Sequence, residues 1–239
     1  MNRNKFLTGL GIAIIAFAIG YLGGNVIPVK APLWVGFDTT AIILANERAV
    51  ECQLIRMDIE VVGEQIGLSE RQQTDYVQFV EAATAKYKLP PILLHAIVSV
   101  ESGYDPSAVH PSIFIKGKTT RAVGLTGVVW EYHGDSLKVE KVAFSRLELT
   151  EPRINLMASA YILHKYIVDI IKENPKIAEN RLFDELIKRY YGAYDTAYKD
   201  RMYARIKETA SKQWINRVVQ SIFTEYKPKP TITDIKVTK

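Results

Sequence analysis

Apolar side chains fill the chain from Phe6 to Ile27 without a single charged residue. A helix of that length rises about 33 Å, enough to cross a hydrocarbon core of about 30 Å. Arg3 and Lys5 precede the stretch and only Lys30 follows closely, so the positive-inside rule places the N-terminus in the cytoplasm. The pattern therefore predicts that residues 1–28 form a transmembrane anchor. A cleaved signal peptide is the alternative, although its apolar region is normally shorter and a clean Ala-x-Ala site should follow it.

Residues 29–71 have the pattern of a linker followed by an amphipathic helix. Two prolines lie between Val29 and Gly36, and apolar residues then recur at helical spacing from Ala41 to Val62, with charged residues between them. We expect this helix to end near Gly67. Its apolar stripe needs a partner, and the sequence leaves three open: the domain that follows, another subunit or the membrane surface.

Two further helices are expected before residue 103. Ser69 and Gln72 have the spacing of a capping box, and apolar and aromatic residues then recur at helical intervals up to Tyr87. The segment Leu89-Pro90-Pro91 breaks this helix, and a proline can begin the next one, where a missing N–H is harmless. From there to Val100 apolar residues occupy nearly every side, which predicts a helix buried all round.

Glu101 ends this apolar helix, where a negative charge is unfavourable for two reasons. Burial disfavours the ionised form of a carboxyl group, and the C-terminus of a helix carries partial negative charge. Both effects predict a raised pKa for Glu101. A carboxylic acid that stays protonated near neutral pH is suited to protonate a glycosidic oxygen. The alternative is an ordinary helix-end glutamate, solvated or paired with a basic side chain.

The segment after Glu101 is rich in turn-forming residues, and it contains Asp105 directly before Pro106. A glycosidase that uses a nucleophile needs two carboxyl groups about 5 Å apart. Asp105 is the nearest candidate for the second carboxyl group, but a role in the turn is the better explanation of this residue.

We expect a loop over His110–Arg121. Its basic residues either rim a cleft for an acidic polymer or are simply solvated.

Two more helices are expected in the second half of the chain. The first has a core face between Ala158 and Ile170 and is ended by Asn174-Pro175, and the second runs from Leu182 to Tyr191. Residues 211–239 are expected to form a C-terminal helix and a flexible basic tail.

Length and composition fit one ordinary domain with appendages, because the chain has 239 residues. Its net charge of +5 suits an anionic partner such as peptidoglycan, a membrane surface or nucleic acid, without selecting among them. The single Cys52 cannot form an internal disulfide. One cysteine and four scattered histidines do not have the spacing of a metal site, so none is expected.

Four short motifs follow one another between residues 72 and 208. They are Glu101-Ser102, Ala122–Val128, Pro152–Asn155 and Tyr190–Ala193. Together, in this order, they resemble the soluble lytic transglycosylase family, which has a lysozyme-like fold. The resemblance implies a predominantly all-α, lysozyme-like catalytic domain over residues 72–210, preceded by the transmembrane anchor and the connecting amphipathic helix. It also implies that Pro152 opens a helix that crosses the domain, and that Tyr198, Tyr203 and Ile206 belong to a closing helix.

The resemblance also implies roles for single residues of the motifs. Glu101 is implied to be catalytic. Six residues are implied to contact substrate: Ser102, Gly124, Leu125, Thr126, Tyr190 and Tyr191. Tyr190 takes the position of the family tyrosine that lies beside the catalytic glutamate. Thr126 and Gly127 stand where the family commonly has Met and Gln, and Tyr191 stands where it has Asn, so the saccharide contacts are expected to differ.

The implied activity is cleavage of the β-1,4 bond between N-acetylmuramic acid and N-acetylglucosamine, with a 1,6-anhydromuramoyl product. Neither a metal nor an organic cofactor is implied. The expected partners are peptidoglycan glycan strands outside the cytoplasmic membrane and the membrane itself. Binding of nucleic acid is not expected. Membership of an envelope-spanning or virion complex is left open. Two alternatives remain: a hydrolytic lysozyme, and a largely non-catalytic component of envelope, secretion or phage-virion assembly.

Overall fold

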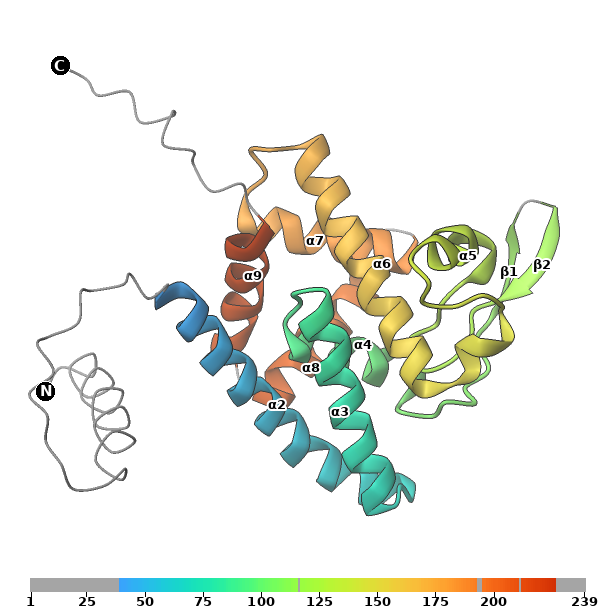
Figure 1. The fold of residues 1–239 in the computed structure, drawn as a ribbon, viewed down its shortest axis with the longest axis horizontal. Helices are drawn as coiled ribbons and strands as arrows, with labels where there is room; N and C mark the ends of the chain where they lie inside the picture. The colour runs from blue at the N-terminus through green and yellow to red at the C-terminus, as the bar shows by residue number, and fades with distance from the viewer. Residues whose placement is uncertain (1–38, 116, 193–194, 211, 227–239) are drawn as a thin grey trace, which may run out of the picture. The chain divides into compact units, whose positions relative to one another are not determined.

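The computed structural model describes residues 39–115, 117–192, 195–210 and 212–226, so the predicted anchor and basic tail lie outside the described residues. Helices dominate the described part, as the sequence predicted (Figure 1). In chain order the elements are α2 (Thr39–Ile66), α3 (Glu70–Lys86), α4 (Pro91–Ser102), β1 (Ser112–Ile115), β2 (Lys118–Arg121), α5 (Trp130–Val139), the short 3-10 helix η1 (Leu147–Thr150), α6 (Pro152–Glu173), α7 (Glu179–Tyr191), α8 (Thr196–Ala210) and α9 (Lys212–Tyr226).

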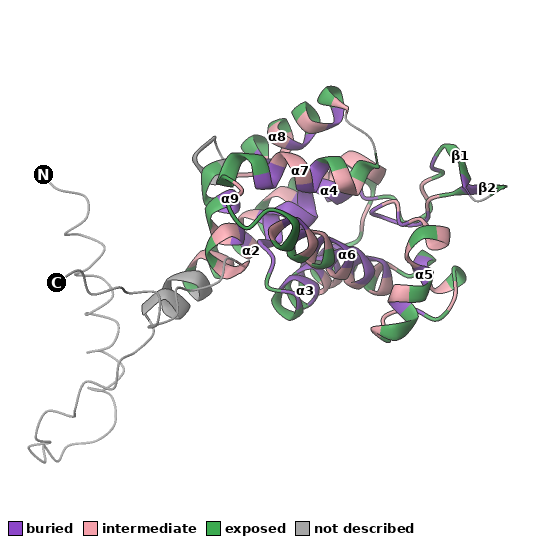
Figure 2. Ribbon diagram, turned by 90° about the horizontal axis from the view of Figure 1, so that it is seen from above, coloured by how far each residue is buried: buried purple, intermediate pink, exposed green. Residues whose placement is uncertain are grey.

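Helix α4 lies inside the domain, and α3, α6 and α8 pack against it. Its residues Pro91–Val98 are all buried, as Figure 2 shows by colour. The helix begins at Pro91 and ends at Gly103, whose positive φ of 57° ends the helix in the left-handed region. The capping box of Ser69 and Gln72 is also present at the start of α3. The sequence-based prediction of this pair of helices is therefore confirmed.

Helix α2 packs against the domain with one face, which answers the question that the sequence left open. Ile55 and Ile59 are fully buried in the main core. Glu51 reaches the start of α4, where its Oε2 accepts a hydrogen bond from the backbone N–H of Ile92 at 3.0 Å. Pro90 offers α4 no side-chain cap, so α2 satisfies this otherwise orphaned donor.

A buried polar network also joins α2 to α4. The Nε2 of His95 lies 2.8 Å from Oδ2 of Asp58, and its Nδ1 lies 2.9 Å from the hydroxyl of Tyr76. Arg205 of α8 donates to the same Asp58 oxygen and, at 2.7 Å, to the hydroxyl of Tyr104. Because these groups are partnered with one another, the domain can bury them without leaving a charge unpaired.

The segment His110–Arg121 is not only a loop, which corrects the sequence-based expectation. It contains an antiparallel hairpin in which Ser112 pairs with Arg121 and Ile115 pairs with Lys118. Isoleucine and threonine favour strands, and Gly117, with φ of 79°, lies in the turn between them. The expectation was wrong because the alternation is short and the basic residues of the segment are typical of a loop.

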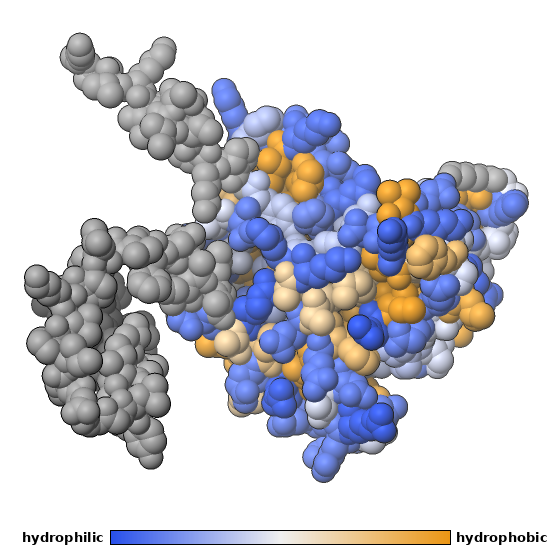
Figure 3. Space-filling model, viewed as in Figure 1, coloured by the Kyte–Doolittle hydropathy of each residue, from blue (hydrophilic) through white to orange (hydrophobic). Residues whose placement is uncertain are grey.

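The chain between α4 and α6 forms a small second core against α6. Its buried members include Val123, Val128 and Leu137, and Ala158 and Ile162 from α6 complete it. Three apolar side chains of this part are exposed, namely Val139, Phe144 and Leu147. Figure 3 shows orange, hydrophobic patches on the surface of the molecule. The turn after β2 contacts both cores, because Val123 and Val128 belong to the second core and Leu125 belongs to the main core.

Helix α6 is a central element of the fold. It begins at Pro152 and its C-cap is Asn174, as predicted. Among the described helices it is the one long and apolar enough to cross a membrane, yet it packs against α3 and α7, and 56% of its apolar window is buried inside the protein. We therefore interpret α6 as a core helix.

Glu51→Gln should remove part of the pH dependence of stability. Burial raises the pKa of Glu51 from 4.5 to about 7, so the folded protein binds more protons than the unfolded chain between these values. Glu51 therefore makes its full contribution to the stability of the folded state below pH 4.5, and this contribution is lost as pH rises through about 7. The amide still accepts from Ile92 but does not ionise.

Urea denaturation of the wild type and Glu51→Gln at about pH 5 and about pH 8 measures this effect. The wild type should lose up to about 3 kcal/mol more of its free energy of unfolding between the two conditions than the variant. Glu60→Gln, which changes an exposed glutamate of the same helix, is the control and should behave as the wild type. An equal pH dependence in the wild type and Glu51→Gln would contradict the assignment.

Candidate active site

Glu101 is the second-last residue of α4, and its side chain is 18% exposed. Burial raises the pKa of its carboxyl above the ordinary value, in the direction that the sequence predicted. Three neighbours oppose this shift, namely Tyr198, then His110, then Arg201. The carboxyl is thus held partly out of water, next to groups that stabilise its ionised form.

Tyr198 of α8 brings a buried phenol close to this carboxyl. Its hydroxyl lowers the pKa of Glu101, yet its geometry is not that of a formed hydrogen bond with any described residue. Burial and then Glu101 raise the pKa of Tyr198. Tyr191 stacks on Tyr198, with ring centroids 4.3 Å apart and 25° between the planes. Tyr191 is 42% exposed, so the stack extends from the carboxyl to the surface.

His110 faces Glu101 from the segment that precedes β1. Its ring is 7% exposed, and its Nδ1 lies 3.9 Å from Oε2 of Glu101. The other ring nitrogen, Nε2, lies 2.9 Å from the carbonyl oxygen of Gly124. The ring therefore bridges the carboxyl and the backbone of the turn that follows β2.

This turn approaches the carboxyl through glycine. Gly124 and Gly127 have positive φ values of 75° and 66°. A Cβ on Gly127 would lie 3.0 Å from Oε2 of Glu101 and 3.2 Å from Cε1 of His110. A Cβ on Gly124 would lie 2.3 Å from Nδ2 of Asn155. Both positions need glycine, because a side chain would strain the backbone and collide with neighbours.

Asn155 of α6 fixes the turn from the inside. Its Nδ2 donates to the carbonyl oxygens of Val123 and Leu149, both at 2.9 Å. Its Oδ1 accepts from the backbone N–H of Thr126 at 3.0 Å and from the Thr126 hydroxyl at 2.7 Å. The motif Pro152–Asn155 thus contributes to the site through this one buried amide.

Tyr190 lies behind the same turn. Its hydroxyl donates to the carbonyl oxygen of Thr126 at 2.8 Å and lies 2.6 Å from Oγ of Ser159. Burial and then the charge of Glu101 raise the pKa of Tyr190, which indicates that the two residues are near each other. Among the described residues, the hydrogen bonds of Tyr190 join it to the turn rather than to the carboxyl of Glu101.

The residues expected to contact substrate occupy different environments. Thr126 is fully buried and Leu125 is 3% exposed, so their side chains belong to the interior. The Oγ of Ser102 donates to the carbonyl oxygen of Val98 at 3.0 Å, within α4. Gly124 shapes the turn, and Tyr191 is the member of the set with a largely exposed ring.

Sequence reasoning gave no role in the site to three neighbours of Glu101, namely His110, Tyr198 and Arg201. His110 appeared as the first residue of an expected loop, and Tyr198 as part of a closing helix. Nothing in their spacing signals the contact, because they reach Glu101 from separate elements. The position of Asp105 agrees with turn chemistry, since its Oδ1 accepts from the backbone and the hydroxyl of Ser107.

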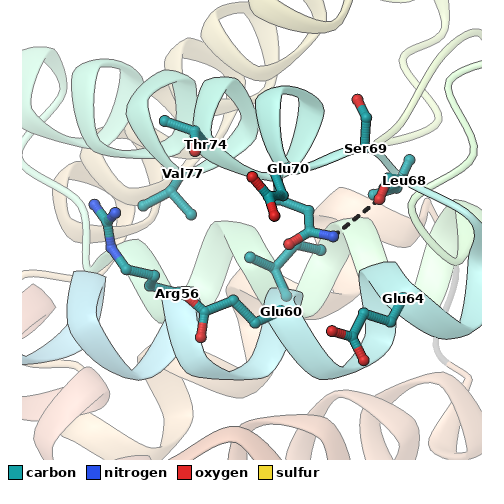
Figure 4. Close-up of a pocket in the computed structure, with 10 residues that line it drawn as sticks. Arg56, Glu60, Glu64, Leu68, Ser69, Glu70, Thr74 and Val77 are labelled. Atoms are coloured by element: carbon teal, nitrogen blue, oxygen red, sulfur yellow. Dashed lines mark hydrogen bonds between the residues drawn. The ribbon is translucent and has the colours of Figure 1, made fainter.

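Two hollows of the domain lie apart from Glu101. One of about 660 Å³ lies between α2 and α3 and is lined by acidic side chains, among them Glu60, Glu64 and Glu70 (Figure 4). Another, of about 170 Å³, is lined by Tyr104 and Leu125 among others. Among the described residues, no group of three or more His, Cys, Asp or Glu side chains could hold a metal ion.

Comparison with known proteins gives one match. Residues 78–195 match the family model of the transglycosylase SLT domain. The matched segment includes α4 with Glu101, the turn after β2, α6 and α7. No curated protein and no solved structure matches the chain.

Gly127→Ala should perturb Glu101 through contact, beyond the strain it adds. The new methyl group lies 3.0 Å from Oε2, so it should desolvate the carboxyl further and raise the pKa of Glu101. Gly67→Ala is the matched control, because Gly67 has a similar φ of 78° and a Cβ added there would meet no atom within 4 Å. Backbone strain should cost each variant about 1 kcal/mol of stability, and Gly127→Ala should lose more than Gly67→Ala because its new methyl group also crowds Glu101 and His110.

Titration of the Glu101 carboxyl carbon by NMR distinguishes the two effects. A higher pKa in Gly127→Ala and an unchanged pKa in Gly67→Ala would support the contact. An unchanged pKa in Gly127→Ala would show that the turn does not confine this carboxyl.

Proposed function

Because residues 78–195 belong to the transglycosylase SLT family, we propose that the chain is a peptidoglycan lytic transglycosylase. It cleaves the β-1,4 bond between N-acetylmuramic acid and N-acetylglucosamine and leaves a 1,6-anhydromuramoyl end. The observation that carries the proposal is the place of Glu101 at the half-buried end of α4, where its side chain is 18% exposed and burial raises its pKa. A carboxyl group that stays protonated is able to act as a general acid.

In the first step Glu101 donates its proton to the bridging oxygen as the bond from that oxygen to C1 of the muramoyl sugar breaks. The carboxylate that remains is stabilised by Tyr198 and Arg201, because both lower the pKa of Glu101. The positive charge that develops on the sugar is stabilised by the substrate's own acetamido group, one of the known exceptions to the use of two carboxylates.

In the second step the C6 hydroxyl attacks C1, and the Glu101 carboxylate accepts the proton of that hydroxyl. Glu101 returns to its protonated state and no water is consumed. Asp105 has no part in this scheme, because it is exposed and binds Ser107. One protein carboxyl therefore serves both steps.

The residues around Glu101 have separate roles in binding the saccharide and in positioning the site. Tyr191 presents an exposed ring, and aromatic faces pack well against the apolar face of a sugar, so it contacts saccharide. Tyr190 and Thr126 act through the backbone of the turn, since the Tyr190 hydroxyl donates to the carbonyl oxygen of Thr126 and the Thr126 hydroxyl donates to Oδ1 of Asn155. Ser102 stands next to Glu101 at the end of α4 and orients the sugar or the carboxyl.

A hydrolytic lysozyme and a non-catalytic assembly module are the competing functions. The first would deliver water to C1 in place of the C6 hydroxyl, so it differs in product. The second has no need for an acid with a raised pKa, so the environment of Glu101 counts against it.

Glu101→Gln should abolish glycan cleavage and leave the fold intact. The amide keeps the volume of the side chain but has no proton to transfer. Release of soluble fragments from purified peptidoglycan measures the activity, and thermal unfolding measures the fold. Asp105→Asn is the control and should keep wild-type activity, because Asp105 lies in an exposed turn. A Glu101→Gln variant that retained even about a tenth of the wild-type rate would refute the assignment.

We also propose that the domain lies outside the cytoplasmic membrane, tethered by residues 6–27, which lie outside the described residues. The sequence pattern alone supports this topology, through the uncharged stretch and the positive charges that precede it. Protease added to intact spheroplasts should therefore digest the domain. Protection of the domain until the membrane is lysed would show that the orientation is reversed.

A further inference from the structure

We propose that His110 is a positioning residue that shares one proton with Glu101, so that the two side chains act as a pair. The proposal rests on the proposed function of Glu101 and adds a partner that no sequence motif indicates. Nδ1 of His110 and Oε2 of Glu101 lie 3.9 Å apart, and the ring of His110 is 7% exposed. Glu101 remains the catalytic residue, because it alone exchanges a proton with the sugar.

The contact with Gly124 sets the tautomer of His110. The partner of Nε2 is a backbone carbonyl oxygen at 2.9 Å, and a carbonyl oxygen only accepts hydrogen bonds. Nε2 must therefore carry a proton, and in the neutral ring Nδ1 is left with a lone pair. That lone pair lies on the side of the ring that faces Glu101.

The acceptor that fixes the ring is itself fixed. Gly124 is held between Asn155 and the carbonyl oxygen of Leu149, which would lie 2.3 and 2.5 Å from an added Cβ. Asn155 bonds the neighbouring residues Val123 and Thr126. The turn therefore fixes the position of the His110 ring. When the two side chains come closer together, the Glu101 side chain is the one that moves.

The distance of 3.9 Å is longer than a hydrogen bond, and the structure leaves room to shorten it. Gly127 lies beside both groups, and its missing side chain leaves open the space next to Oε2 of Glu101 and Cε1 of His110. Hydrogen bonds of catalytic pairs are often long without substrate and tighten when it binds. Rotation of the Glu101 side chain by about 1 Å towards the ring is sufficient.

Other titratable and charged groups face Glu101 from the elements packed around it. Helix α8 supplies Tyr198 and the permanently charged Arg201, and α7 supplies Tyr190. Asp105, in the segment after α4, is exposed and bonded to Ser107. Tyrosine and arginine keep their protonation state near neutral pH, so His110 is the group that can exchange a proton with Glu101 in that range.

Sharing one proton suits a residue that must act first as acid and then as base. Before substrate binds, the acidic hydrogen on Oε2 of protonated Glu101 points at Nδ1, which holds the carboxyl in one orientation. When the glycosidic oxygen lies beside Oε2, this hydrogen exchanges its bond to Nδ1 for one to the glycosidic oxygen, and Glu101 can then donate it. After Glu101 has given its proton to the leaving oxygen, neutral His110 keeps its own proton on Nε2. It therefore does not protonate the Glu101 carboxylate. The proton of the C6 hydroxyl then returns to Glu101, so the pair ends with the protons it began with.

Two variants separate the two ring nitrogens. In His110→Gln the terminal amide replaces Nε2 and still donates to Gly124, but nothing faces Glu101. In His110→Asn the amide oxygen replaces Nδ1 and accepts from protonated Glu101 without ever becoming charged. We expect kcat to fall about tenfold in His110→Gln and to stay within about threefold of the wild type in His110→Asn. Equal losses in the two variants would overturn the proposal.

The pH profile of kcat tests whether the proton is shared. Coupled groups titrate in two steps, and their attraction widens the pH range over which the pair holds one proton. The alkaline limb of the profile should therefore move to lower pH by about one unit in both variants, since neither side chain can be protonated. A merely structural role would lower activity without moving this limb. An unchanged limb in both variants would overturn the proposal.

NMR titration keeps the test independent of activity and of the stability of the variants. In the wild type, the 15N shifts of His110 should show a protonated Nε2 and a bare Nδ1 at high pH. The carboxyl carbon of Glu101 should titrate in two steps in the wild type and in one step in His110→Asn, which removes the second group of the pair. His164→Gln is the matched control, because His164 pairs with Tyr226, and it should leave the Glu101 titration unchanged. A single step in the wild type would overturn the pairing, whereas coupled titration without glycan cleavage would refute the proposed function alone.

Discussion

Burial of a helix that ends in a carboxyl group is the constraint on which the rest of the structure depends. Residues Pro91–Val98 of α4 are buried on every side, so this helix needs partners all round and a substitute for water at its first N–H groups. The domain supplies both: α3, α6 and α8 pack against α4, and Glu51 of α2 accepts from Ile92. The end of α4 is thereby fixed, and Glu101 with it.

A second rigid group meets this helix end from the opposite side. The buried Asn155 holds a turn whose glycines allow the backbone to approach Glu101 and His110 closely. Because Asn155 belongs to α6 and Glu101 to α4, the distance between turn and carboxyl is set by the packing of the main core. Substitutions in the turn and substitutions in α6 should therefore both change the environment of the Glu101 carboxyl.

Much of the fold could be predicted from sequence, because its signals are local. The capping box at Ser69, the proline start of α4 and the burial that raises the pKa of Glu101 each follow from a short stretch of residues. The hairpin at Ser112–Arg121 was missed because its alternation is short and its charged residues suggest a loop. The partner of α2 could not be predicted, because an apolar stripe does not identify the surface that covers it.

The environment of the carboxyl was less accessible to sequence reasoning. His110 and Tyr198 reach Glu101 from separate segments, and no spacing along the chain reports that contact. Thr126 was expected to contact substrate, yet its side chain is buried against Asn155 and Ser159. A family motif identifies which segment forms a site, whereas the direction of each side chain depends on packing between segments.

The central claim is that one carboxyl, on Glu101, serves as acid and then as base in a reaction that consumes no water. Mass spectrometry of the muropeptides released from purified peptidoglycan tests it most directly, since the two possible products differ by one water molecule. The account predicts 1,6-anhydromuramoyl ends from the first turnovers onward. Release of reducing N-acetylmuramic acid ends in their place would contradict it, because that product requires an activated water molecule at C1.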